Sequence, residues 1–333
     1  MNPAVPVAFF IFNRPIPTRR VFDEIRKLRP AILLITADGP RLDAEVPLVQ
    51  ATRKIVADID WPCEVRRNYA ETNLGVKRRM YTGIDWVFEQ FEQAILLEDD
   101  CVPDPTFFPY CTELLEKYRD DERIMMISGD NMLPGKRWNS DSYYFTVMTH
   151  IWGWATWRRA WKHYNAAMPD WPEDIAAGFP EDFVPSPNAA RFYSKMMDDT
   201  YTGNLNAWGL AWMYAAWKRR GLSIAPAVNL ISNIGFGPDA THTRKADPFA
   251  ELPVEPMPFP LVHPGKITAN TEADLAFFKK PSIKSLVPHS LAEEDIGLVK
   301  ICGVCRHLIS TLPRSASAKR LPSKRRMFVP SPE

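Results

Sequence analysis

The chain lacks a disulfide framework, a long hydrophobic run and a marked excess of either charge. Its five cysteines among 333 residues are an odd number at irregular spacing, which is typical of a protein kept in a reducing cytosol. No apolar run approaches the roughly 20 residues that a membrane span requires. The formal net charge of +1 argues against a dedicated nucleic-acid binder. We therefore expect a cytoplasmic protein that has no nucleic-acid partner.

Glycine-rich phosphate-binding motifs are absent as well. Neither Gly-x-x-x-x-Gly-Lys-Ser/Thr nor Gly-x-Gly-x-x-Gly occurs, so phosphate would have to be bound through a metal ion and side chains. Cys302 and Cys305 have the spacing of a zinc or redox pair, but no second pair completes a tetrahedral site. Two ordinary thiols are the simpler interpretation.

Strands and helices are predicted to alternate over the first hundred residues. Short apolar runs predict strands, and apolar residues at helical spacing predict the helices between them. The expected strands are 5–12, 32–36, 63–67 and 94–97, and the expected helices are 17–28, 46–59 and 76–91. This alternation predicts an α/β fold with a Rossmann-type mixed, mostly parallel sheet flanked by helices.

Regular alternation fades in the second half of the chain. A helix at 107–118 and a strand at 124–127 are followed by helical segments at 154–164, 190–199 and 207–220 and by strands at 222–224 and 228–231. A short helix is expected near 291–309. The tail beyond it is basic and rich in Pro and Ser, so it either contacts an anionic membrane surface or remains a solvated terminus.

Three adjacent carboxylates, Glu98, Asp99 and Asp100, end the strand at 94–97. Like charges repel at a sheet edge unless a cation lies there, and ligands of open α/β sheets bind where the strands end. We interpret this run as the site of a divalent cation that carries a phosphorylated ligand. A solvated acidic turn is the alternative.

Other polar residues follow neighbouring strands and are expected at the same edge of the sheet. Asn13 and Arg14 follow the first strand, Asp38 the second, and Asp130 a later one. Arg14 can neutralise phosphate, and Asp38 can accept a hydrogen bond from a base N–H or simply occupy a turn before Gly39.

A third group of polar residues lies around the start of the helix at 76–91. Asn73 is followed by Lys77, Arg78 and Arg79, cations that a helix start disfavours. Their position suggests a bound anion, although a solvated basic face is equally compatible.

The run from Ala94 to Phe108, with its three carboxylates and the following Val-Pro-Asp, resembles the metal-binding strand of N-acetylglucosaminyltransferase I. The resemblance extends over about residues 5–245, and it is specific at the acidic run and loose elsewhere. That family implies an inverting, GT-A-fold glycosyltransferase that uses a nucleotide-diphospho-sugar and Mn²⁺ (or Mg²⁺). It implies that Asp100 binds the metal, Asp99 the ribose and Glu98 the donor sugar, while Arg14 and Asp38 hold the nucleotide, which is expected to be UDP.

The chain departs from this family at the general base. The family has an aspartate just after a tryptophan, where this chain has Gly209 after Trp208. Another carboxylate must then accept the proton, and Asp130 or Asp199 is favoured over Asp198 and Asp239.

Further residues of the site are expected in the second half. His242 is a candidate metal ligand, because a late histidine completes the metal shell in many GT-A enzymes. Trp154 or Trp208 could stack on a sugar, but a buried core stripe is the simpler explanation of Trp154, Trp157 and Trp161 at helical spacing.

The resemblance, taken with the acidic run, implies transfer of a sugar from a UDP-sugar to a saccharide or other hydroxyl acceptor, as in surface polysaccharide or glycoconjugate synthesis. Residues 1–131 are expected to bind the nucleotide sugar, 132–285 the acceptor within the same domain, and 286–333 to form a helix and a flexible basic tail. A catalytically inactive binding protein of this fold and a sugar-phosphate nucleotidyltransferase are the alternatives.

Overall fold

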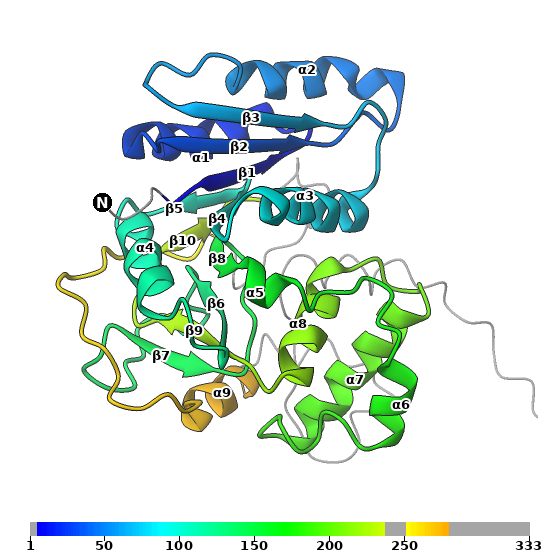
Figure 1. Cartoon of the computed structure of the whole chain (residues 1–333), viewed down its shortest axis with the longest axis vertical. Coiled ribbons are helices and arrows are strands. Elements are labelled where there is room, and N and C mark those ends of the chain that lie inside the picture. Colours follow the sequence, from blue (N-terminus) through cyan, green and yellow to red (C-terminus); the bar gives the residue numbers. More distant parts are fainter. Residues whose placement is uncertain (1–4, 237–250, 280–333) are drawn as a thin grey trace, which may run out of the picture.

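A computed structural model describes residues 5–236 and 251–279 of the chain. Its main feature is an eight-stranded sheet that runs along the length of the molecule in the order β3-β2-β1-β4-β8-β6-β9-β7 (Figure 1). The strands of this sheet are β1 (Val7–Ile11), β2 (Ile32–Ala37), β3 (Glu64–Tyr69), β4 (Gln93–Glu98), β6 (Ile124–Ser128), β7 (Tyr143–Thr146), β8 (Trp154–Trp157) and β9 (Leu222–Pro226). A second, two-stranded sheet pairs β5 (Cys101–Pro103) with β10 (Ile231–Asn233) in antiparallel fashion.

The directions of the strands decide which loops meet. Strands β3, β2, β1 and β4 are parallel, and β8 lies antiparallel between β4 and β6. Since two reversals restore the direction, β6 runs the same way as β4. The carboxyl ends of β1, β2, β4 and β6 therefore lie at one edge of the sheet, as the sequence predicts.

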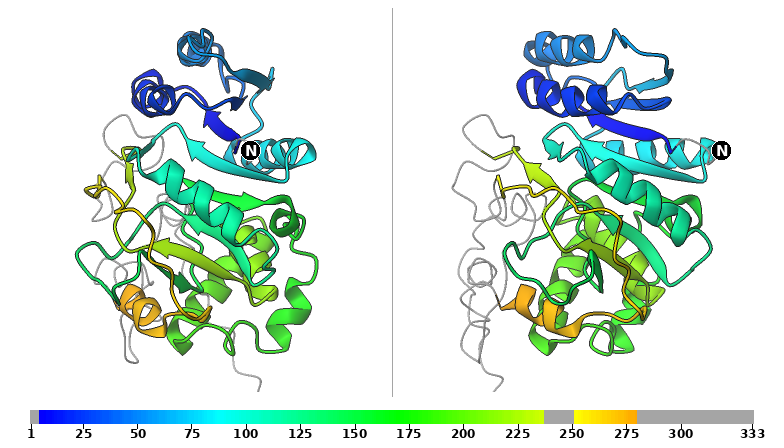
Figure 2. Two further views of the ribbon diagram at one scale, coloured as in Figure 1. Left: turned by 60° about the vertical axis from the view of Figure 1, so that its left-hand side comes forward. Right: turned by 90° about the vertical axis from the view of Figure 1, so that its left-hand side faces the viewer.

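Helices cover both faces of the sheet, as Figure 2 shows from two sides. The helices are α1 (Pro15–Leu28), α2 (Val46–Ile55), α3 (Val76–Gln90), α4 (Phe107–Lys117), α5 (Arg158–Trp161), α6 (Trp171–Ala176), α7 (Pro187–Tyr201), α8 (Trp208–Lys218) and α9 (Thr271–Phe278). Buried side chains of α1 and α4 pack with Phe9 and Ile35 on one face, and those of α3, α5 and α8 pack with Phe10 and Leu34 on the other. Successive strand residues thus alternate between two apolar layers.

The prediction of a mixed, mostly parallel α/β sheet is confirmed, the strand predicted at 228–231 overlaps β10 only at Ile231, and one helix prediction is wrong. Residues 154–157 form strand β8, and only 158–161 are helical. Trp154 and Trp157 therefore do not share a helix face with Trp161. Trp-Ala-Thr-Trp is rich in residues that favour strands, and the pairing of β8 with both β4 and β6 decides the conformation.

Several predictions lie outside the described residues. These are the helix near 291–309, the basic tail, Cys302, Cys305, Asp239 and His242. Within residues 5–236 and 251–279, none of the helices combines the length and the apolar character needed to span a bilayer.

Candidate functional site

The three carboxylates lie at the carboxyl edge of the sheet: Glu98 ends β4, and Asp99 and Asp100 lie between β4 and β5. Asp99 is buried, accepts a hydrogen bond from the backbone N–H of Phe12 at 3.2 Å, and forms an ion pair with Arg14. A guanidinium nitrogen of Arg14 also lies 3.0 Å from Oδ2 of Asp100. The structure thus brings together Arg14 and the acidic run, which are 84 or more residues apart in the sequence.

Negative charge predominates at this edge. Three carboxylates face one guanidinium, which leaves a surplus of two negative charges when all are ionised. Burial, reinforced by Asp100 and Asp99, raises the pKa of Glu98 to about 8, with Arg14 acting in the opposite direction. Burial also raises the pKa of Asp99, although Arg14 opposes this shift. A cation would relieve the surplus charge.

The donor set fits a divalent cation of the Mg²⁺ or Mn²⁺ type. Carboxylate oxygens are the ligands that such hard cations prefer. Over the described part of the chain, no three His, Cys, Asp or Glu side chains converge on one metal position. The protein would therefore supply one or two carboxylates, and phosphate and water the remaining ligands, as is usual for Mg²⁺.

The segment after β10 approaches Asp100 closely. The backbone N–H of Ile234 donates to the carbonyl oxygen of Asp100 at 2.8 Å. A Cβ atom at Gly235 would lie 2.1 Å from Oδ2 of Asp100, so any side chain at 235 would displace this carboxylate. The antiparallel pairing of Cys101 with Asn233 holds the two segments in this register.

Asp38 is a structural anchor in this structure. Its carboxylate accepts hydrogen bonds from the backbone N–H groups of Gly39 (2.9 Å), Leu74 (2.8 Å) and Gly75 (3.1 Å) and from the side-chain amide of Asn73 (3.1 Å). Four donors from the protein itself occupy this carboxylate. Asp38 and Asn73 therefore lie together because they are hydrogen-bonded to each other, and they do not form a free binding surface.

The Asp38 carboxylate lies at the start of α3. Gly75 precedes α3, and its N–H points at Asp38. Arg79 is buried and donates to the backbone and side-chain oxygens of Asn68 at 3.0 Å, whereas Arg78 is exposed. The Asp38 carboxylate thus lies at this helix start, and the binding of a further anion there stays a prediction. Asn13, at the same edge, donates to Glu45 at 3.2 Å.

The two candidate bases lie in different environments. Asp130 follows β6 at the same edge as the acidic run, is fully buried, and accepts a hydrogen bond from the hydroxyl of Ser128 at 2.7 Å. Asp199 lies on α7, where Lys195 contacts it at 2.8 Å across one helical turn. The structure brings Asp130, but not Asp199, to the carboxyl edge of the sheet.

The tryptophans expected at the sugar site belong to the core. Trp154 and Trp208 are 1% and 0% exposed, and their rings stack on each other with centroids 5.9 Å apart. Neither ring offers a free face to a sugar in this structure. A Cβ atom at Gly209 would lie 2.8 Å from Cδ1 of Ile151, so an apolar side chain borders the position where the family has its base.

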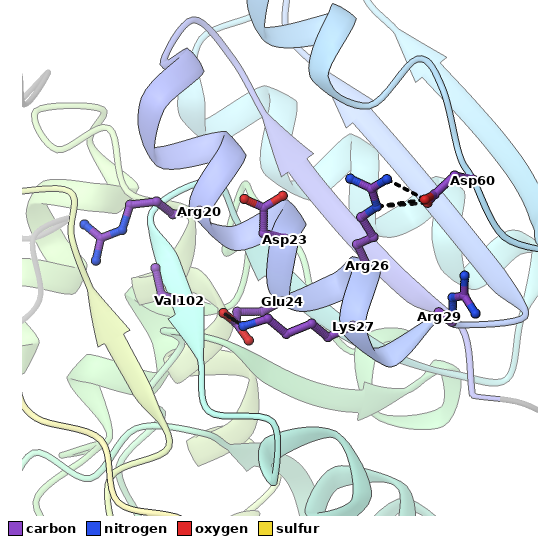
Figure 3. Close-up of a pocket in the computed structure, with 8 residues that line it drawn as sticks. All are labelled: Arg20, Asp23, Glu24, Arg26, Lys27, Arg29, Asp60 and Val102. Carbon is purple, nitrogen blue, oxygen red and sulfur yellow. Dashed lines mark hydrogen bonds and ion pairs between the residues drawn. The ribbon is translucent and has the colours of Figure 1, made fainter.

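An open depression of about 660 Å³ lies beside α1, and Figure 3 shows the residues that line it. They are Arg20, Asp23, Glu24, Arg26, Lys27, Arg29, Asp60 and Val102. Arg26 pairs with Asp60, and Lys27 with Glu24 at 2.6 Å. The lining holds four basic and three acidic side chains, and this depression is not formed by the acidic run.

The sequence matches no family model and no curated protein. Solved structures similar to parts of the chain include 4-diphosphocytidyl-2C-methyl-D-erythritol synthase from Anaerococcus prevotii, with 10% identity, a TM-score of 0.29, and coverage of 53% of this chain and 78% of that chain. UDP-glucose pyrophosphorylase is similar in its complex with UDP-glucose (11% identity, TM-score 0.25, covering 44% of this chain and 64% of that one). Its apo form is similar as well (11% identity, TM-score 0.32, covering 66% and 90%). The resemblance to N-acetylglucosaminyltransferase I stays a prediction from the sequence.

Proposed function

We propose that the protein is a metal-dependent inverting glycosyltransferase, which transfers a sugar from a UDP-linked donor to a hydroxyl acceptor such as a saccharide. The observation that carries the proposal is the contact of one arginine with two adjacent carboxylates at the ends of β1 and β4. A cation and an arginine at one strand edge are the elements that bind a diphosphate when no glycine-rich loop is present.

The residues have distinct tasks in this proposal. Asp100, with its side chain 16% exposed, would hold Mn²⁺ or Mg²⁺, and Asp99 fixes Arg14 toward the phosphates. When bound, the divalent cation supplies charge stabilisation to the departing diphosphate. The nucleotide would lie along the edge near Arg14 and Asn13, and the sugar near Glu98.

Calorimetric titration with UDP in the presence of Mn²⁺ tests the binding site. We expect saturable binding that EDTA removes and that Asp100→Asn weakens at least about tenfold, because a ligand to the cation and one negative charge are lost. Asp60→Asn is the matched control, since Asp60 pairs with Arg26 in the α1 depression. Binding that is equally strong with EDTA or in Asp100→Asn would contradict the proposal.

Product analysis separates the chemical alternatives. A glycosyltransferase releases UDP from UDP-glucose or UDP-N-acetylglucosamine, whereas a nucleotidyltransferase releases pyrophosphate from UTP and a sugar phosphate. The turn after β1, Phe12-Asn13-Arg14-Pro15, has no glycine to wrap a triphosphate. Binding of UDP without release from any donor would favour a catalytically inactive nucleotide-sugar-binding protein.

A further inference from the structure

The hydroxyl of Ser128 lies between two buried oxygens at the end of β6. Its Oγ is 2.7 Å from Oδ1 of Asp130 and 2.7 Å from the backbone carbonyl oxygen of His150. Both separations are the usual length of an O–H···O hydrogen bond. Ser128 and Asp130 are themselves fully buried.

The two hydrogen bonds of the Ser128 oxygen, one with Asp130 and one with His150, require two protons. Ser128 supplies one, and the carbonyl of His150 can only accept. When Asp130 is protonated, its carboxyl group can supply the second proton by donating to Oγ, and Ser128 then donates to His150. If Asp130 is ionised, Ser128 turns to donate to Oδ1, and the carbonyl of His150 loses this donor.

The surroundings of Asp130 favour the protonated carboxyl. The titratable side chains that face it are the thiol of Cys101 on β5 and the phenol of Tyr144 on β7, and burial raises the pKa of both so that they are neutral. Burial also raises the pKa of Asp130 to about 7. The Ser128 hydroxyl and the backbone N–H groups of Asp130 and Trp152 lower this pKa and only partly offset the effect of burial. No charged side chain contributes to this shift.

The other oxygen of Asp130 is free to take a proton. Oδ2 is buried and has no hydrogen-bond partner, which is costly for a carboxylate unless a ligand supplies one. Asp130 and the acidic run follow β6 and β4, parallel strands on either side of β8, so both lie at the edge of the sheet where the donor sugar is proposed. The groups that cover Oδ2 would have to shift to admit an acceptor hydroxyl.

We propose that Asp130 is the general base of the transfer and that Ser128 is its positioning residue. This inference rests on the proposed function. Asp130 accepts the proton of the acceptor hydroxyl at Oδ2. The oxygen uses the released electron pair to bond to the anomeric carbon, and the bond from that carbon to the diphosphate breaks, with its electrons leaving on UDP. Ser128 holds Oδ1 in both protonation states by turning between Asp130 and His150.

The pH dependence of UDP release tests the assignment, with UDP-N-acetylglucosamine as donor, Mn²⁺ and water as acceptor. The wild-type rate should rise with pH through about 7, as Asp130 loses its proton. Asp130→Asn should lower the rate about a hundredfold or more and leave UDP binding intact. Ser128→Ala removes a donor to the ionised carboxylate and should shift the rise by about one pH unit to higher pH.

Asp60→Asn is the control, since Asp60 pairs with Arg26 in the α1 depression and contacts neither Asp130 nor Ser128. It should leave the profile unchanged. An unaltered rate in Asp130→Asn, or an unaltered profile in Ser128→Ala, would overturn the assigned roles, whereas failure to bind UDP would overturn the proposed function as well.

Infrared spectroscopy tests the protonation of Asp130 without any substrate. Near pH 6 the spectrum should contain the C=O stretching band of a protonated carboxylic acid that disappears in Asp130→Asn. If Asp130→Asn removes only carboxylate absorption, the proton assignment is wrong even where UDP binds.

Discussion

Asp38 shows how a single carboxylate can organise a loop that sequence reasoning assigns to a ligand. Its neighbours in space are the backbone N–H groups of Leu74 and Gly75 and the side-chain amide of Asn73, and these contacts tie the end of β2 to the start of α3. The side chain of Arg53 adds to the junction by donating to the carbonyl of Asp38 at 3.0 Å. A sequence shows an acidic residue before Gly39 but not the four donors that surround it.

We predict that Asp38→Ala lowers the free energy of unfolding by about 2–4 kcal/mol, because three backbone N–H groups lose their acceptor in a largely buried position. Urea-induced unfolding measures the change. Asp38→Asn retains one acceptor oxygen and should fall between the wild type and Asp38→Ala. An unfolding midpoint in Asp38→Ala equal to that of the wild type would show that water replaces these bonds without loss.

The pairing of Arg14 with the acidic run was within reach of sequence reasoning for a physical reason. Residues that follow parallel strands must converge at one edge, so the prediction needed only the strands and their direction. The role of Ser128 was not within reach, because it depends on the carbonyl of His150, which a loop brings to within 2.7 Å.

Among the elements, the strands of the first half were predictable and β8 was not. β1, β2 and β4 are apolar runs buried on both faces, a pattern that only a covered parallel sheet explains. β8 follows a loop of low regularity, and its conformation depends on pairing with two strands far away in the sequence. The local pattern of apolar residues does not indicate which distant strands a segment will pair with.

Helix α9 docks through a buried acid, which makes the docking dependent on pH. Asp274 accepts a hydrogen bond from the hydroxyl of Thr146 and a longer one from the N–H of Val147 at 3.4 Å. Phe277 of the same helix packs against the ring of His150, with centroids 4.9 Å apart. The helix thereby braces the loop that carries the carbonyl bonded to Ser128.

We predict that the stability of the protein declines as the pH rises through the titration range of Asp274. Burial raises the pKa of Asp274 to about 6, so the native state binds this proton more tightly than the unfolded state. This contribution is fully present below about pH 4, falls between about pH 4 and 6 by at most about 3 kcal/mol, and is constant above.

Urea unfolding of the wild type and Asp274→Asn across this range measures the contribution of Asp274. The difference between the two proteins should change with pH as described, because the amide does not titrate. A difference that is independent of pH would contradict the predicted shift.

At the scale of the whole molecule, the two halves of the sequence share one sheet. β8, from the second half, fills the space between β4 and β6, and β10 pairs with β5 beside the acidic run. The proposed nucleotide-binding half, 1–131, therefore completes neither its sheet nor its site without later residues. The proposed division at 131 describes roles within one domain, not separate folding units.

We predict a single cooperative unfolding transition in scanning calorimetry for the part of the chain that forms this sheet. Removing β8 would leave the edges of both β4 and β6 unpaired, and removing β10 would uncover Asp100, so neither half keeps its buried surface alone. UDP with Mn²⁺, at about a hundred times its dissociation constant, should raise the midpoint of that one transition, since it stabilises the native state by about 2.7 kcal/mol. Two resolved transitions, of which only one moves with UDP, would instead mean that the halves unfold independently and that the acidic run is built by the first half alone.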